Sequence, residues 1–299
     1  MPEVDLAGVF IPTVTPFAPR GEVDLDAFEG NVRAWSETGV HGFVVGGSTG
    51  EALLLDAAER LNLWTATREV APELVLIAGT GAESTRTTIR MCRAAAQAGS
   101  DAVLVQPPAF YKGAMTREAL ADHFRAVADA SPVPVILYQV PLRMSTLDLA
   151  TSLIAELSEH ENIVGVKDSR GKLELIRELV AATSEGFQVL VGSGALLHSA
   201  LEAGATGGIL GVGNVVPDLC AGIFAAHGRG DPAEAAAIQS RVAPLHTGIV
   251  GGMGVPGVKF AVDLVGRAGG SPRSPLRPLP ETGRSEVARL LEDAGLIAN

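Results

Sequence analysis

The sequence is poor in cysteine and in long apolar runs. It has only two cysteines, Cys92 and Cys220, which cannot build a disulfide framework. No cysteine–histidine cluster has the spacing of zinc ligands, so we expect no metal site. Every apolar stretch of about 20 residues is interrupted by glycine, proline or charge, which argues against a membrane-spanning helix. The acidic N-terminus lacks the basic start of a signal peptide. These absences predict a cytoplasmic protein with no membrane partner.

Positive charge is also in short supply. The 299 residues contain 23 lysines and arginines against 34 aspartates and glutamates, which gives a net charge of −11. Such an acidic chain is a poor match for nucleic acid, so no nucleic-acid partner is expected. Only four of the basic residues are lysines, and each therefore merits inspection: Lys112, Lys167, Lys172 and Lys259.

Short apolar runs rich in valine and isoleucine recur along the first 210 residues, and segments with helical periodicity follow them. Continuous short runs of this kind are typical of strands buried on both faces. The expected strands are residues 8–14, 42–45, 74–78, 102–105, 133–138, 163–167, 188–191 and 207–210. The expected helices are residues 25–38, 57–70, 84–98, 117–130, 146–159, 172–183 and 195–203. Ser84 and Thr146 are suited to cap the third and fifth of these helices.

This alternation predicts an α/β fold, a (β/α)8 TIM barrel of parallel strands. The alternative is a doubly wound sheet, which would place a glycine-rich fingerprint after the first strand, where the chain reads PTVTPF. After Pro217 the strands stop, and a proline-rich loop at 269–280 interrupts the expected helices 218–227, 232–250, 258–265 and 281–298. We therefore expect a barrel catalytic domain over residues 1–228 and a C-terminal helical region over residues 229–299.

Lys167 closes one of the expected strands, at the end where barrel active sites lie. Desolvation disfavours the charged form of a buried amine and frees its lone pair, and such an amine can form a Schiff base with a ketone. The alternative is a lysine that extends to water or pairs with Asp168. Tyr138 ends the preceding strand, so its phenol would lie beside the amine and could move protons. Alternatively it is a core aromatic with a satisfied hydroxyl.

The turn at residues 46–51, GGSTGE, combines backbone N–H groups with the hydroxyls of Ser48 and Thr49. This combination suits a carboxylate or phosphate, although a plain turn that caps a helix would read the same way. No Gly-Lys-Ser/Thr follows, so it is not a Walker loop. Residues 79–84, GTGAES, resemble a dinucleotide fingerprint but have a serine at the third glycine position and follow the third strand.

These motifs, in this order, resemble the dihydrodipicolinate synthase/N-acetylneuraminate lyase family of class I aldolases. The resemblance covers nearly the whole chain and includes PTVTPF, GGSTGE, AGTGA at 78–82, LYQVP at 137–141, VGVKDS at 164–169, GSG at 192–194 and GVGN at 211–214. It implies a TIM barrel, a homotetramer and Schiff-base chemistry on pyruvate or another small oxo acid. Under it, the covalent imine on Lys167 takes the place of a cofactor.

The resemblance also implies roles for individual residues. Lys167 matches the Schiff-base lysine, Tyr138 the proton-relay tyrosine, and Ser48 and Thr49 the hydroxyl pair that binds the substrate carboxylate. Further substrate-binding positions are Arg143, which matches an arginine for the carboxylate of a second substrate, and Ile209, Ser169 and Gly192.

The chain departs from the family's pattern at one position of the proton relay. Synthases carry a tyrosine where this chain has Phe110, and that tyrosine serves a neighbouring subunit. We take Phe110 and the adjacent Tyr111 as the candidates for this position. Met144 and Ser145 also replace the usual Thr-Gly, and no histidine marks a lysine-inhibition site, so we expect no feedback by lysine.

Several stretches are more similar to 4-hydroxy-2-oxoglutarate aldolases, among them FYKGAMT at 110–116 and GVPGVK at 254–259. We therefore expect a carbon–carbon or carbon–oxygen lyase whose preferred reaction is the reversible cleavage of 4-hydroxy-2-oxoglutarate to pyruvate and glyoxylate. The alternatives are 4-hydroxy-tetrahydrodipicolinate synthase, which joins pyruvate and aspartate semialdehyde, and a non-catalytic barrel that binds an oxo acid.

Overall fold

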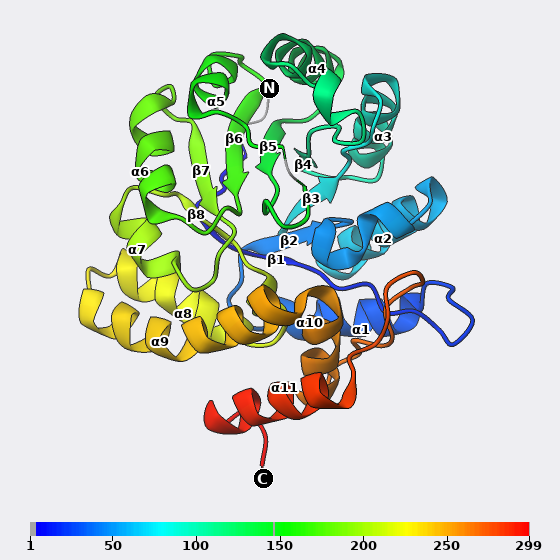
Figure 1. Ribbon diagram of the computed structural model, residues 1–299, viewed down its shortest axis with the longest axis vertical. Coiled ribbons are helices and arrows are strands. Elements are labelled where there is room, and N and C mark those ends of the chain that lie inside the picture. The colour runs from blue at the N-terminus through cyan, green and yellow to red at the C-terminus, as the bar shows by residue number, and fades with distance from the viewer. Residues whose placement is uncertain (1–3, 146, 299) are drawn as a thin grey trace.

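The computed structural model describes residues 4–145 and 147–298, and in these ranges eight parallel strands close into a barrel in sequence order (Figure 1). The predicted (β/α)8 TIM barrel is therefore confirmed. Its strands are β1 (Gly8–Pro12), β2 (Gly42–Val45), β3 (Val75–Gly79), β4 (Ala102–Val105), β5 (Val135–Gln139), β6 (Ile163–Asp168), β7 (Gln188–Val191) and β8 (Gly207–Ile209).

A helix follows each strand and covers the outside of the barrel (Figure 1). Two of these helices have the predicted bounds, and Ser84 caps the third by accepting from the N–H of Thr87. The helices are α1 (Leu25–Ser36), α2 (Ala57–Val70), α3 (Thr85–Gln97), α4 (Arg117–Ala130), α5 (Thr151–Leu157), α6 (Leu173–Ala182), α7 (Leu197–Glu202) and α8 (Pro217–Gly228). No helix in the described part of the chain is both long and apolar enough to cross a membrane.

The predicted start of the fifth helix at residue 146 was wrong, because α5 begins at Thr151. The side chain of Gln139, at the end of β5, donates to the carbonyl of Leu147 and accepts from the N–H of Leu149. These bonds occupy backbone groups that a helix would have used for itself. The predicted cap, Thr146, lies outside the described residues.

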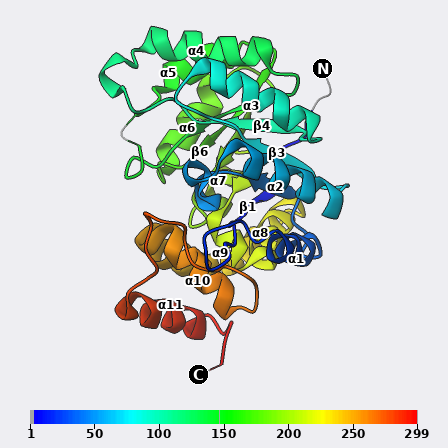
Figure 2. The same cartoon turned by 90° about the vertical axis from the view of Figure 1, so that its right-hand side faces the viewer.

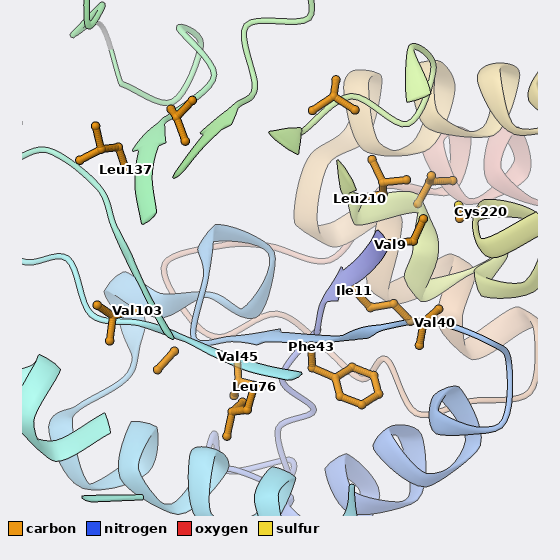
Figure 3. Close-up of a cluster of buried hydrophobic side chains, with 14 of the residues drawn as sticks. Val9, Ile11, Val40, Phe43, Val45, Leu76, Val103, Leu137, Leu210 and Cys220 are labelled. Atoms are coloured by element: carbon orange, nitrogen blue, oxygen red, sulfur yellow. The ribbon is translucent and has the colours of Figure 1, made fainter. Parts of the chain in front are cut away.

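Alternate strand residues face opposite sides of the barrel wall, as the period of two in a strand requires. The outward set packs against the helices and includes Val9, Ile11, Phe43, Val45 and Leu76 (Figure 3). The inward set fills the barrel and is a separate buried cluster that includes Phe10, Val44, Ile77, Ile136, Tyr138, Leu190 and Ile209. The interior of the barrel is therefore a packed core rather than a pore.

The C-terminal region is helical, as predicted, but its helices have other bounds. An α-helix was expected over residues 232–250, but α9 (Pro232–Leu245) continues into a π-helix (His246–Met253), and α10 (Gly254–Leu264) begins at the next residue, where Gly254 has a positive φ of 64°. Residues 251–257, which lie between two of the expected helices, belong to the π-helix and to α10. Such π-helical turns are rare and occur frequently at functional sites.

The final helix, α11 (Glu281–Asp293), packs on α10 on the side away from the barrel (Figure 2). It is shorter than the predicted 281–298. The proposed boundary between residues 228 and 229 falls just after α8, which packs directly against α9. The division into domains 1–228 and 229–299 stays a prediction.

Candidate active site

A cavity of about 380 Å³ opens at the C-terminal end of the barrel strands, where TIM-barrel active sites lie. Residues from the β2, β5, β6, β7 and β8 ends and from the π-helix contribute to its wall. Eight of the predicted site residues line it together: Ser48, Thr49, Tyr138, Arg143, Lys167, Ser169, Gly192 and Ile209.

Lys167 and Tyr138 are neighbours because β5 and β6 pair in a register that places them directly opposite each other. Both belong to the inward-facing phase of their strands, and each is only 4% exposed. The amine of Lys167 lies 4.3 Å from the centroid of the Tyr138 ring. The phenol oxygen accepts a hydrogen bond from Ser48 at 3.4 Å. Amine, phenol and hydroxyl thus form one contiguous group on the cavity wall.

The alternative partner for Lys167, Asp168, is occupied elsewhere. Its carboxylate receives hydrogen bonds from the guanidinium and the backbone N–H of Arg170, the former at 2.7 Å. Arg170 also bonds to Asp148 at 3.0 Å. Within the described residues, the amine of Lys167 has no carboxylate at ion-pair distance, and its low exposure shows that it does not extend to open water.

The turn that carries Ser48 and Thr49 is a short 3₁₀-helix (Ser48–Gly50) directly after β2. It packs closely on the segment after β1, since a Cβ on Gly50 would meet the carbonyl oxygen of Thr13 at 2.7 Å. Thr15 donates to the carbonyl of Gly50 at 2.8 Å. The PTVTPF motif therefore supports the turn.

A buried ion pair holds the same turn from the side of the C-terminal region. Glu51, which ends the turn with a left-handed φ of 59°, bonds to Lys259 of α10 at 2.8 Å, and both side chains are fully buried. Lys259 also donates to the carbonyls of Thr15 and Ser271. The second oxygen of Glu51 accepts from the N–H of Arg273. We call Glu51, Lys259 and Arg273 the junction cluster.

Ser169 and Gly192 meet across the ends of β6 and β7. A Cβ on Gly192 would lie 2.0 Å from the hydroxyl oxygen of Ser169, so only glycine permits this approach. The N–H of Gly192 donates to the carbonyl of Asp168 at 2.6 Å. The hydroxyl of Ser169 is thereby held beside the end of β7, within the cavity wall.

Arg143 brings positive charge to the outer part of the cavity. Its guanidinium donates to the carbonyls of Val250, at 2.7 Å, and of Gly251, both in the π-helix. These bonds use two of the five N–H groups of the guanidinium and leave its charge uncompensated by any carboxylate in the described residues. An anion at this end of the cavity would therefore find a positive partner.

Phe110 and Tyr111 do not join the cavity of this chain. They are 79% and 70% exposed, and their rings meet edge to face at 5.2 Å between centroids. Glu83, from the segment that resembled a dinucleotide fingerprint, accepts from the N–H groups of Ala109 and Phe110 and holds the loop. That Phe110 or Tyr111 serves the site of a neighbouring subunit stays a prediction.

Sequence reasoning missed three polar side chains on the cavity wall: Arg170, Ser193 and His246. Arg170 and Ser193 lie beside predicted residues, so proximity to Lys167 and Gly192 could have identified them. His246 comes from a helix nearly 80 positions after Lys167, and a single histidine in an amphipathic segment gives no signal of its own.

A model of the dihydrodipicolinate synthetase family matches residues 5–294. The chain belongs to this family. It is 39% identical to a protein of Emericella nidulans named probable mitochondrial 4-hydroxy-2-oxoglutarate aldolase, over 95% of this chain and 93% of that one. It is 36% identical to 4-hydroxy-tetrahydrodipicolinate synthase of Acidiphilium cryptum, over 97% and 99% of the two chains.

Solved structures of the family have the same fold. Dihydrodipicolinate synthase of Acinetobacter baumannii, complexed with pyruvate, superposes with a TM-score of 0.93 and 32% identity over 98% of this chain and 100% of that one. The protein is accordingly a lyase of the class I aldolase type, like its family. The relatives carry two activities in their names, so membership alone does not give the substrate.

Proposed function

We propose that the protein cleaves 4-hydroxy-2-oxoglutarate reversibly to pyruvate and glyoxylate through a Schiff base on Lys167. The observation that carries this proposal is the buried amine of Lys167, without a carboxylate partner in the described residues, over the ring of Tyr138. The cavity beside it has hydroxyls for one carboxylate and Arg143 for another. A diacid whose ketone lies next to one of its two carboxylates fits this distribution.

The reaction begins when the lone pair of Lys167 attacks the C2 ketone and the oxygen leaves as water, which yields a protonated imine. Ser48 and Thr49 hold the C1 carboxylate. The C4 hydroxyl loses its proton, the C3–C4 bond breaks, and its electron pair moves into the imine to form an enamine while glyoxylate departs. A proton returned to C3 restores the imine, and water then releases pyruvate. Tyr138, which accepts from Ser48, is placed to carry these protons.

The second candidate is 4-hydroxy-tetrahydrodipicolinate synthase, in which the enamine of pyruvate attacks aspartate semialdehyde. The relative from Acidiphilium cryptum carries that name. Arg143 would serve the carboxylate of either acceptor. The greater identity to the aldolase of Emericella nidulans supports cleavage as the first choice.

Turnover assays distinguish these reactions. Purified protein is given 4-hydroxy-2-oxoglutarate in one assay and pyruvate with aspartate semialdehyde in the other, and product formation is followed in both. We expect a higher kcat/KM for the first. Faster synthesis would contradict our preference, and pyruvate binding without turnover of either substrate would leave a non-catalytic barrel.

Replacement of Arg143 tests whether its guanidinium binds the second carboxylate of the substrate. Arg143→Ala is expected to lower kcat/KM for 4-hydroxy-2-oxoglutarate by about 10- to 100-fold, because hydrogen bonds to a charged group are lost. Trapping of pyruvate on Lys167 with borohydride should change little, since pyruvate has no second carboxylate. Equal loss in both assays would mean that Arg143 only supports the π-helix.

We also propose that the protein assembles as a homotetramer in the cytoplasm. The exposed, mutually packed rings of Phe110 and Tyr111 and the side chain of Leu53, which is 75% exposed, are apolar groups that a second copy would cover. The two cysteines are free and buried, as suits a reducing compartment. Light scattering on the purified protein, with Phe110→Asp as the interface variant, tests the assembly, and a monomer for the unmodified chain would refute it.

A further inference from the structure

Ser193 and His246 form a hydrogen-bonded pair on the cavity wall that the reaction scheme above does not use. Ser193 follows β7 and lies next to Gly192, whereas His246 begins the π-helix. The Ser193 hydroxyl and the Nε2 of His246 are 3.2 Å apart. Both residues line the same cavity as Lys167 and Arg143. A strand end of the barrel is thus linked to the C-terminal region at the site itself.

The hydrogen bonds fix the tautomer of this histidine. The N–H of Gly194 donates to Nδ1 at 3.1 Å, so Nδ1 must carry a lone pair rather than a proton. In a neutral imidazole the proton then lies on Nε2, which donates to the oxygen of Ser193. Burial, aided by the charge of Arg143, lowers the pKa of His246 to about 4, which agrees with a neutral ring.

This arrangement determines what the hydroxyl of Ser193 can do. Its oxygen already accepts from His246, so its own hydrogen is available to donate to another acceptor. A residue with a side chain at position 194 would disrupt the arrangement, since a Cβ there would lie 2.5 Å from a methyl of Val212 and 3.2 Å from Nδ1 of His246. The glycine at 194 permits the backbone to reach the imidazole.

Arg143 lies in the same part of the cavity, since it bonds to the π-helix that His246 begins and its charge acts on the His246 ring. A hydroxyl that donates and a guanidinium that donates together suit an anionic group with two acceptor oxygens. The imidazole cannot act as a free base there, because Nδ1 is occupied by Gly194 and Nε2 carries a proton.

We propose that His246 is a positioning residue that orients the hydroxyl of Ser193 toward the distal, C5 carboxylate of the substrate, beside Arg143. Ser193 then binds the substrate directly, and His246 acts through it. This inference rests on the proposed function and adds to it the group that selects diacids over monoacids.

The test compares two substrates that differ at the distal carboxylate. 4-Hydroxy-2-oxoglutarate has it, whereas 4-hydroxy-2-oxopentanoate has a methyl group and yields pyruvate and acetaldehyde through the same bond cleavage. Ser193→Ala and His246→Leu should each lower the ratio of the two kcat/KM values by about tenfold, since one hydrogen bond to a charged group is lost. His246→Gln, whose amide can donate to Ser193, should restore most of the ratio.

Ser240→Ala is the matched control, because Ser240 is exposed on α9 and bonds only to a carbonyl of its own helix in the described structure. It should leave both substrates unaffected. If Ser193→Ala lowers the kcat/KM values for both substrates equally, or lowers neither, the ratio is unchanged. That result would overturn the inference and leave the aldolase assignment standing. Failure of the unmodified protein to turn over either substrate would instead overturn the proposed function.

Discussion

Two lysines are buried in this protein, and their surroundings are opposite. Lys259, in the junction cluster, is fully buried and donates three hydrogen bonds, to Glu51, Thr15 and Ser271. Lys167, in the cavity, is almost as buried but has only the face of an aromatic ring beside its amine within the described residues. One amine has every N–H occupied, and the other is open toward a cavity.

The comparison shows that burial does not by itself mark a reactive lysine. Desolvation lowers the pKa of Lys259, although Glu51 opposes the shift, and yet the amine has no open space to meet a substrate. A nucleophile needs a lone pair and access to the carbonyl that it attacks. Lys259 holds the turn of Ser48 and Thr49 through Glu51, whereas Lys167 lies in the cavity wall with that turn and is the amine that we propose to react.

The largest expected effect comes from the cavity lysine. Lys167→Met should lower kcat by at least about a thousandfold, because the covalent step has no other amine. The free energy of unfolding should change by less than about 1 kcal/mol, since an apolar chain replaces an amine without an ion-pair partner. Steady-state assays and urea titration measure the two quantities. A strongly destabilised variant would show that the amine has a structural role.

The junction lysine should give the reverse result. Lys259→Met leaves the carboxylate of Glu51 buried and unpaired, which should lower the free energy of unfolding by about 3–5 kcal/mol. The double variant Lys259→Met/Glu51→Met should recover much of that loss, because no buried charge remains without a partner. Urea titration of the three variants gives the coupling, and additive losses would show that the pair does not act as a unit.

Tyr138→Phe probes the proton relay and keeps the ring beneath the amine. We expect kcat to fall by about a hundredfold or more, the usual effect of losing a general acid–base group. Stability should change little, because the lost bond to Ser48 is long at 3.4 Å. Single-turnover measurements would locate the slow step, and an unchanged kcat would remove Tyr138 from the relay.

As the pH falls, the cavity wall at His246 and the surroundings of the junction cluster at Glu59 should lose stability in different pH ranges. The pKa of His246 falls from 6.5 in the unfolded chain to about 4 in the fold, so the unfolded chain binds the proton first and stability is lost from pH 6.5 down to about 4. Glu59, beside the junction cluster, has its pKa lowered from 4.5 by its hydrogen bond to Arg273, so its contribution is lost only at lower pH.

The pKa of His123 is also lowered to about 4, so His123 loses stability in the same pH range as His246. Comparison of His246→Gln with the unmodified protein isolates the contribution of His246, because His123 is present in both. Between pH 6 and pH 5 the variant should lose about 1.2 kcal/mol less stability than the unmodified protein, because His246 no longer contributes. Urea titrations at a series of pH values provide the comparison. Identical slopes would mean that His246 titrates normally in the fold.

The barrel and the neighbouring positions of Tyr138 and Lys167 could be predicted from the sequence, because both depend on local patterns. Period-two burial and the order of apolar runs place Tyr138 and Lys167 at the ends of adjacent strands, and pairing of neighbours in a barrel then brings them together. The cap at Ser84 and the bounds of α2 and α4 are likewise local.

The parts that could not be predicted depend on contacts between distant segments. Glu51 and Lys259 are separated by 208 positions, and nothing at either position indicates the other. The π-helix accepts hydrogen bonds from Arg143, about 100 residues before it, and the sequence of the π-helix does not indicate this contact. The start of α5 depends on the side chain of Gln139, and the tautomer of His246 depends on the N–H of Gly194.

We expect Lys167, and not the other buried lysine, to react with an oxo acid. The direct test is to incubate the folded protein with pyruvate and borohydride, digest it, and map the reduced imine by mass spectrometry across all four lysines. We predict one adduct per chain, on Lys167, with Lys259 unmodified. An adduct on Lys259, or none on Lys167, would contradict the assignment of Lys167 as the lysine that forms the imine.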